Sequence, residues 1–201
     1  MSKIALKYGG TIDKFVGDAI LIFFGDPETK GDKEDAYSCV LMALEMQERM
    51  HHLKNLWEGQ GITNPLEIRI GINTGYCNVG NFGSENRLDY TIIGGEVNLA
   101  SRLESNAMTG QILISQETYA LIKKHIVCEK KDEIKVKGIA HKIQTYQVVG
   151  SYKNIAQKRK ILNEEFDGFN LNIDLNISKK NKVITSLENT LKQLKKDEKS
   201  N

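Results

Sequence analysis

The chain has 201 residues, enough for one domain with a hydrophobic core and a tail. Its apolar fraction of 40% and charged fraction of 27% are those of an ordinary globular protein, and a net charge of +2 is too small to indicate a nucleic acid or an anionic membrane as a partner. Because no apolar run approaches the roughly 18 residues of a membrane-spanning helix, and the start has no signal-peptide pattern, we expect neither feature.

The three cysteines, Cys39, Cys77 and Cys128, are odd in number and far apart, without a Cys-x-x-Cys pair. This spacing favours reduced thiols over a disulfide framework or a zinc site. We therefore expect a cytoplasmic protein.

The first predicted elements form a hairpin. Two strand-like runs, residues 11–16 and 19–24, are separated only by residues 17–18, a two-residue loop typical of a tight turn. Residues 32–58 follow as the longest helical candidate, in which we expect Asp32 to cap the first turn.

Short strands and helices fill the middle of the chain. The sequence predicts strands at 66–72, from about 76, at 89–93 and at 112–114, and helices over 96–107 and 115–124. A final hairpin is expected between residues 134–137 and 144–149. This irregular order, unlike a βαβα alternation, predicts an α+β fold with a largely antiparallel sheet.

The predicted domain covers residues 1–150, and the tail covers residues 151–201. Residues 153–159 form a basic linker, and apolar residues alternate over 169–175 as they do in a strand. Residues 184–194 predict an amphipathic last helix.

The predicted hairpin carries two polar residues suited to phosphate chemistry. Asp18 lies at its tip, where a carboxylate on a rigid ribbon can bind a hard cation such as magnesium. Lys14 lies four residues earlier and offers a mobile cation. Taken alone, Asp18 is explained equally well as a favourable turn residue.

Two later segments carry similar chemistry. Asn98 and Arg102 share a face of their predicted helix, where an amide beside a guanidinium suits the hydroxyls and phosphates of a nucleotide. A solvated face on which Arg102 pairs with an acid such as Glu104 would explain the same residues. Lys137 precedes a glycine turn from which it could reach a phosphate, which is a weak signal alone.

Together these segments resemble the catalytic domain of the class III nucleotidyl cyclases, from about Ile4 to Gly150. The similar stretches are GTIDKFVGD at 10–18, RIGINTG at 69–75 and IIGGEVNLASRLE at 92–104. The resemblance implies a ferredoxin-like cyclase sandwich, with a mostly antiparallel sheet flanked by helices. It also implies a head-to-tail homodimer, or a heterodimer with another cyclase domain, in which the two protomers share the active site.

The resemblance assigns a role to each candidate residue. Lys14 matches the position that contacts the purine, where lysine resembles adenylate cyclases and guanylate cyclases carry glutamate. Thr91 matches the second base-reading position, and Lys137 matches a lysine that holds the terminal phosphates. Asn98 matches the residue that orients the ribose, and Arg102 the residue that stabilises charge on the α-phosphate.

The implied reaction converts ATP to 3′,5′-cyclic AMP and pyrophosphate, with Mg²⁺ or Mn²⁺ as cofactor. Asp18 matches the second of two metal-binding aspartates. The family's first strand, which carries the first aspartate, has no counterpart here, and Asp167 and Asp174 lie in tail segments that do not resemble it.

We therefore expect this chain, paired with itself, to be nearly inactive. It could still supply its remaining site residues to an intact partner. Two other functions stay open: a guanylate cyclase, which Lys14 disfavours, and an inactive dimerisation or regulatory module, which the missing aspartate favours.

Overall fold

The computed structural model describes residues 1–84, 87–136, 142–152, 161–166, 169–174 and 180–197. The chain divides into two compact units, Met1–Ser151 and Tyr152–Asn201. None of the helices in these ranges is both long enough and apolar enough to span a membrane.

The first unit begins with a short helix and the predicted hairpin. Helix α1 (Ser2–Lys7) leads into β1 (Thr11–Val16), which pairs antiparallel with β2 (Ala19–Phe23). Val16 lies opposite Ala19, so the connecting loop has two residues, as predicted.

Helix α2 (Asp32–Gly59) is the longest element, but its start differs from the expectation. Gly31 is its N-cap and makes no side-chain capping bond, so the prediction that Asp32 caps the helix was wrong. The carboxylate of Asp35 instead accepts a hydrogen bond from the backbone N–H of Lys30 at 3.2 Å, which holds the turn before the helix.

Glu45 of α2 ties the helix to the end of α1. Its carboxylate accepts hydrogen bonds from Lys7 Nζ and the Tyr8 hydroxyl, each at 2.6 Å. These bonds, first from Lys7 and then from Tyr8, hold the pKa of Glu45 below its usual range. Burial, together with the bond to Glu45, raises the pKa of the Tyr8 hydroxyl to about 12.

The main sheet has four strands in the order β3-β6-β8-β7: β3 (Ile70–Ile72), β6 (Ile112–Ser115), β8 (Thr145–Ser151) and β7 (Ile126–Lys130). The β3–β6 pair is parallel and the other two pairs are antiparallel. Helix α4 (Gln116–Ile122) follows β6 directly, and the Ser115 hydroxyl caps it by accepting a hydrogen bond from the Thr118 N–H.

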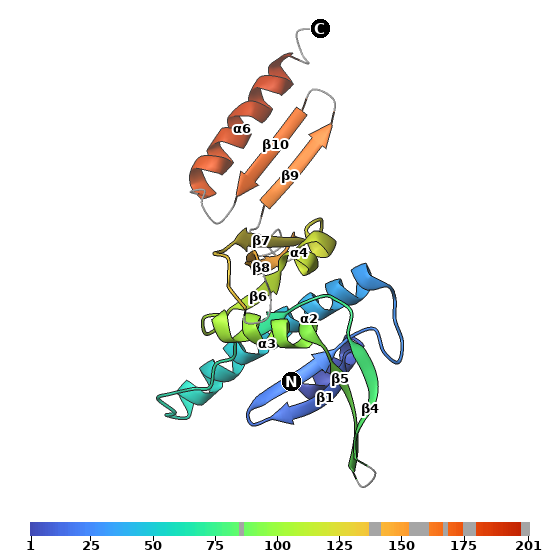
Figure 1. The fold of residues 1–201 in the computed structure, drawn as a ribbon. Helices are drawn as coiled ribbons and strands as arrows, with labels where there is room; N and C mark the ends of the chain where they lie inside the picture. Colours follow the sequence, from blue (N-terminus) through green and yellow to red (C-terminus); the bar gives the residue numbers. More distant parts are fainter. Residues whose placement is uncertain (85–86, 137–141, 153–160, 167–168, 175–179, 198–201) are drawn as a thin grey trace. The chain divides into compact units, whose positions relative to one another are not determined.

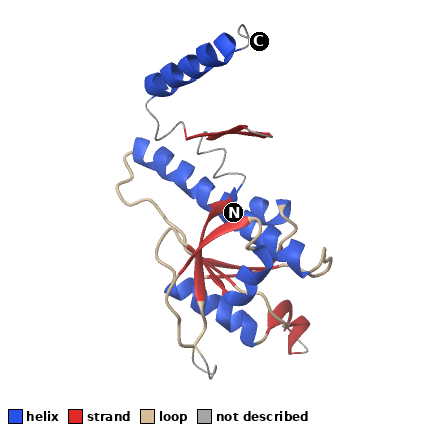
Figure 2. Ribbon diagram, turned by 90° about the horizontal axis from the view of Figure 1, so that it is seen from above, coloured by secondary structure: helices blue, strands red, loops and turns tan. Residues whose placement is uncertain are grey.

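Two further elements complete the first unit. Strands β4 (Asn78–Ser84) and β5 (Arg87–Ile93) form a separate antiparallel hairpin, which projects from the rest of the unit in Figure 1. Helix α3 (Gly95–Asn106) begins just after β5. Figure 2 shows the helices lying around the strands. The predicted α+β class with mostly antiparallel pairing is therefore confirmed.

The core of this unit lies between α2 and the main sheet. The buried residues of its largest cluster are Ala36, Val40, Ala43, Ile72, Ile112, Ile114, Ile122, Ile126 and Val148. A second cluster joins α1 and α2 to the β1–β2 hairpin and β3 through Ala5, Met42 and Met46, with Ile22 and Ile70 packed against them. Burial also raises the pKa of the thiols of Cys39 and Cys128, to about 12 and about 11.

The β1–β2 hairpin and the main sheet are separate sheets in the described part of the chain. Within the described ranges, β2 pairs only with β1, and β3 pairs only with β6. The hairpin and the main sheet therefore share a hydrophobic cluster without sharing a hydrogen-bond ladder.

Two further sequence predictions in this unit were wrong. Strand β8 pairs with β7, a strand that was not predicted. Of the strand expected over 134–137, the described residues 134–136 contribute only an isolated bridge between Ile134 and Ile143, and residue 137 lies outside the described residues. The strand expected over 66–72 covers only Ile70–Ile72, because the Ile68 carbonyl accepts hydrogen bonds from outside the sheet, from the Gln47 side chain and a loop N–H.

The second unit is a hairpin and a helix. Strands β9 (Ile161–Phe166) and β10 (Phe169–Asp174) pair antiparallel, and helix α6 (Lys180–Asp197) follows. β10 covers the segment with strand-like alternation, and α6 covers the predicted last helix. Strand β9 was not predicted.

Candidate nucleotide site

The tip of the β1–β2 hairpin presents Asp18 to solvent. Asp18 is exposed, and the preceding Gly17 has a φ of +63°, a backbone conformation that favours glycine. Lys14 lies on β1 with 43% of its side chain exposed. The hairpin therefore holds a carboxylate and an ammonium group at its surface, as the sequence predicts.

A β-bulge in β1 brings a buried acid beside Lys14. The strand register shifts between Ile12, opposite Ile22, and Lys14, opposite Leu21, so Asp13 is the extra residue. Only 1% of the Asp13 side chain is exposed, and its Oδ1 lies 3.4 Å from Lys14 Nζ. Neighbours in a regular strand point to opposite faces, and the bulge breaks this alternation.

The same carboxylate holds Thr91 of β5. The Thr91 hydroxyl donates to Asp13 Oδ2 at 2.6 Å, and the Ile92 backbone N–H donates to the same oxygen at 3.2 Å. Thr91 is buried, with 5% of its surface exposed. Asp13 thus brings together Lys14 and Thr91, two predicted substrate-binding residues that are far apart in the sequence.

A second contact fixes β5 to the hairpin. The Tyr90 hydroxyl donates to the carboxylate of Asp26, just beyond β2, and this bond raises the pKa of Tyr90. The backbone carbonyl of Asp26 in turn accepts from the Thr11 hydroxyl at 2.7 Å. The strand that carries Thr91 is therefore anchored to both strands of the hairpin region.

Helix α3 presents Asn98 and Arg102 on an exposed face. Both residues are exposed, whereas Leu99 and Leu103 bury the opposite side. Glu104 does not pair with Arg102, because its carboxylate binds Arg69 Nε at 2.5 Å.

Across the described part of the chain, Arg102 makes no ion pair. Its guanidinium is therefore open to an anionic ligand, which removes the alternative that this arginine serves a local salt bridge.

The described residues offer few side-chain ligands for a metal ion. Asp18 can give one carboxylate to a cation, but the described residues contain no group of three potential side-chain ligands that could hold an ion. A two-metal centre needs carboxylates that bridge or flank two ions. The described residues therefore do not fit such a centre by themselves.

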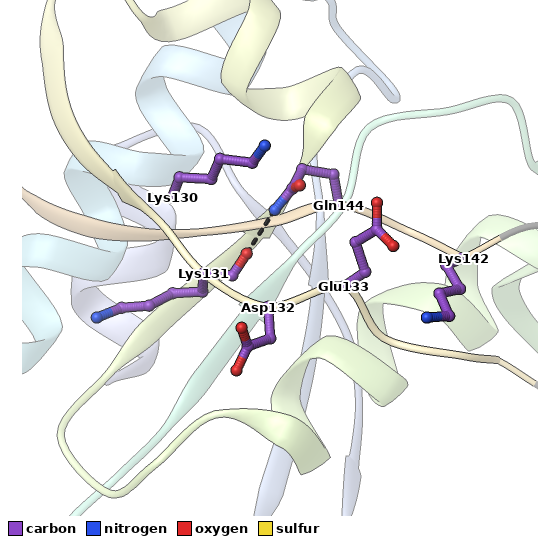
Figure 3. Close-up of a pocket in the computed structure, with 6 residues that line it drawn as sticks. All are labelled: Lys130, Lys131, Asp132, Glu133, Lys142 and Gln144. Carbon is purple, nitrogen blue, oxygen red and sulfur yellow. Dashed lines mark hydrogen bonds between the residues drawn. The ribbon is translucent and has the colours of Figure 1, made fainter.

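The predicted site residues line neither of the two best-formed hollows in the structure. One, of about 690 Å³, is lined by Lys130, Lys131, Asp132, Glu133, Lys142 and Gln144, and Figure 3 shows Gln144 donating to the Lys131 carbonyl. The other, of about 660 Å³, lies beside α3 and is lined in part by Thr74, Glu96 and Glu117. Lys137 lies outside the described residues. Neither hollow is lined by Lys14, Asp18, Thr91, Asn98 or Arg102.

Comparison with known proteins decides the family. Residues 4–150 match the family described as the adenylate and guanylate cyclase catalytic domain. This chain belongs to that family. It is a nucleotidyl cyclase domain, as its motifs indicated.

Solved structures of both nucleotide specificities are similar to this cyclase domain. The adenylyl cyclase CyaB from P. aeruginosa is 62% identical with a TM-score of 0.73, over 76% of this chain and 78% of that chain. The guanylate cyclase domain of RhGC from Catenaria anguillulae, in complex with GTP, is 33% identical with a TM-score of 0.64, over 75% and 78%. The comparisons therefore establish a nucleotidyl cyclase domain and leave the base open.

The curated relatives are much longer proteins. The terminal-differentiation-specific adenylate cyclase of Dictyostelium discoideum is 36% identical over 70% of this chain, but the match covers 7% of that protein. This cyclase domain thus corresponds to a small part of the relatives that it matches.

Sequence reasoning assigned no role to Asp13, although it lies within the first motif. Its signal is the polar pair of Asp13 and Lys14 at consecutive positions of an otherwise alternating strand. Two adjacent polar residues in a half-buried strand indicate a bulge, because one of them must otherwise point into the core.

Proposed function

We propose that this cyclase domain acts on ATP, and that it contributes to the formation of 3′,5′-cyclic AMP and pyrophosphate at a site shared with a second cyclase domain. The observation that carries the proposal is the junction at Asp13, which holds Lys14 and Thr91 together. A donor and an acceptor at one place are what the edge of adenine requires, because its ring N1 accepts and its 6-amino group donates.

The residues of α3 act on the ribose and the phosphates. The Asn98 amide orients the ribose so that its 3′ hydroxyl lies in line with the α-phosphorus, and the Arg102 guanidinium donates to the α-phosphate oxygens. The 3′ oxygen forms a bond to the α-phosphorus as the bond to the bridging oxygen breaks, the hydroxyl proton is lost, and pyrophosphate leaves. In this proposal Lys137 holds the terminal phosphates.

A second cyclase domain completes the site. The proposed cofactor is Mg²⁺ or Mn²⁺. This chain has only Asp18 to match the two metal-binding aspartates of the family. We therefore propose that the metals are bound by a partner that carries both aspartates. Large apolar side chains beside the candidate residues are exposed on both hairpins: Phe15, Val16, Leu88, Tyr90 and Ile93. Such surface is typical of an interface with another protein.

One observation favours a second candidate function. Among the described residues of the candidate site, Asp18 is the only carboxylate that matches a metal ligand of the family. This observation fits an inactive dimerisation or regulatory module, and it fits one half of a shared enzyme site equally well. In that case nucleotide binding is absent or has no consequence for turnover.

The test measures binding and turnover by the purified full chain with Mn²⁺. Calorimetry with α,β-methylene ATP and α,β-methylene GTP is expected to show preferential binding of the ATP analogue, with almost no cyclic AMP formed from ATP by the chain alone. Preference for the GTP analogue would favour a guanylate cyclase. Binding of neither analogue would favour the inactive module.

A further inference from the structure

We propose that Asp13 is a positioning residue that makes the base subsite select adenine over guanine, by fixing the direction of the Thr91 hydrogen bond. The inference rests on the proposed function and adds a residue to it. Asp13 lies one residue from Lys14 and is itself buried, so it acts through its neighbours and not by contact with the base.

The β-bulge makes this arrangement possible. Asp13 is the extra residue of β1, so the pairing with β2 shifts by one residue at this point, and the Asp13 side chain contacts Thr91 and Ile92 of β5. Its Oδ2 accepts from both the Thr91 hydroxyl and the Ile92 N–H, while its Oδ1 is buried without a hydrogen bond and faces Lys14 Nζ. A carboxylate so placed is an acceptor toward every neighbour.

The consequence is that the Thr91 hydroxyl can only accept from a ligand. A threonine hydroxyl has one proton, and here that proton is committed to Asp13 Oδ2 at 2.6 Å. The remaining lone pair can accept from the 6-amino group of adenine. Guanine presents the carbonyl oxygen O6 at the corresponding position, so two acceptors would face each other and neither would be satisfied.

Lys14 is the donor that accompanies the Thr91 acceptor, and it is a donor whether or not Asp13 is present. An ammonium group donates in every orientation, so it suits the N1 acceptor of adenine and opposes the N1–H of guanine. Removing Asp13 therefore leaves Lys14 a donor, but it frees the Thr91 proton to turn toward O6. The effect of Asp13 on base selection should accordingly pass through Thr91.

A purely structural role is the competing explanation, because Asp13 also fastens β5 to the hairpin. The two roles predict different readouts. If Asp13 only holds β5 to the hairpin, its loss weakens the binding of both nucleotides by the same factor. If Asp13 fixes the direction of the Thr91 hydrogen bond, its loss changes the ratio of the two affinities.

The experiment measures dissociation constants of α,β-methylene ATP and α,β-methylene GTP with Mn²⁺ for the full chain and its variants. Asp13→Ala is expected to reduce the preference for the ATP analogue by roughly tenfold to a hundredfold. Asp13→Asn keeps an amide oxygen that accepts from Thr91, so it should retain the preference within about threefold. If circular dichroism shows that Asp13→Ala is unfolded, Asp13→Ser replaces it, because a serine can donate to Thr91 and release the threonine proton.

A double-mutant comparison tests whether the effect of Asp13 on base preference passes through Thr91. Thr91→Val should also reduce the preference, and adding Asp13→Ala to it should change the ratio by no more than about twofold. A folded Asp13→Ala or Asp13→Ser chain with the wild-type ratio would overturn this inference and leave the proposed function standing. Equal losses in Asp13→Asn and Asp13→Ala would overturn it too, by assigning the effect to charge. A wild-type chain that binds neither analogue would overturn both proposals.

Discussion

Gly71 determines how closely α3 packs against β3, and Gly71→Ala should displace the helix that carries Asn98 and Arg102. A Cβ atom at this position would lie 2.2 Å from the Glu104 backbone nitrogen and 2.4 Å from the Ala100 carbonyl oxygen, well inside the 3.4 Å at which ordinary contacts begin. Both atoms belong to the backbone, so no change of rotamer relieves the clash. The helix must therefore move outward by about 1 Å.

This displacement has two measurable costs. Overpacking of this kind costs about 1–3 kcal/mol of unfolding free energy, and we expect the upper end of that range because backbone meets backbone. A shift of about 1 Å in groups that contact the reacting atoms costs about a hundredfold in rate. Urea denaturation followed by fluorescence of Trp57, the single tryptophan, measures the first cost in the unit that contains α3.

Gly95→Ala is the matched control. A Cβ at Gly95, the first residue of α3, would meet no atom within 4 Å, so this change should leave the unfolding free energy within about 1 kcal/mol of wild type or raise it slightly. An unfolding free energy for Gly71→Ala that equals that of Gly95→Ala would refute the packing argument.

Three further outcomes are expected. Arg102→Ala should lower cyclic AMP formation in a complemented dimer by about a hundred- to a thousandfold, and retained turnover would count against the role proposed for this residue. Glu45→Gln should lower the unfolding free energy by up to about 1 kcal/mol at pH 7. Because the hydrogen bond from Lys7 lowers the pKa of Glu45, the difference in unfolding free energy between wild type and variant should vanish as the pH falls through that pKa. A difference that persists at low pH would contradict this. In thiol titration at pH 8, the exposed Cys77 should react first, and the other two thiols, whose pKa burial raises, should react only on unfolding.

The sequence predicted the elements whose signals are local. The two-residue turn fixed the β1–β2 hairpin, and Ser115 before a helical run fixed the start of α4. The sequence did not predict that β8 pairs with β7, because strand pairing depends on which edges meet in the folded sheet and not on the nearest strand-like run. The expected cap at Asp32 failed because the backbone reached helical geometry one residue earlier.

The sequence singled out the individual residues of the candidate site, but not the contacts that join them. The motifs single out Lys14 and Thr91 separately. Only the fold shows that Asp13, the acid directly before Lys14, lies in a bulge and contacts a strand from another part of the chain. The polar pair of Asp13 and Lys14 indicates a bulge, but it does not tell which distant strand the acid contacts, so the link from Asp13 to Thr91 required the structure.

The most direct test of the account mixes this chain with the P. aeruginosa CyaB catalytic domain in which the arginine matching Arg102 is replaced by alanine. The partner must carry both of the metal-binding aspartates that the family resemblance implies, and the substitution removes the residue proposed to stabilise the α-phosphate. If this chain supplies its base-reading and phosphate-binding residues across an interface, cyclic AMP formation from Mn²⁺–ATP should recover with the wild-type chain and not with its Arg102→Ala variant. Absence of recovery in a mixture shown to contain the heterodimer, or equal recovery with both chains, would contradict the account.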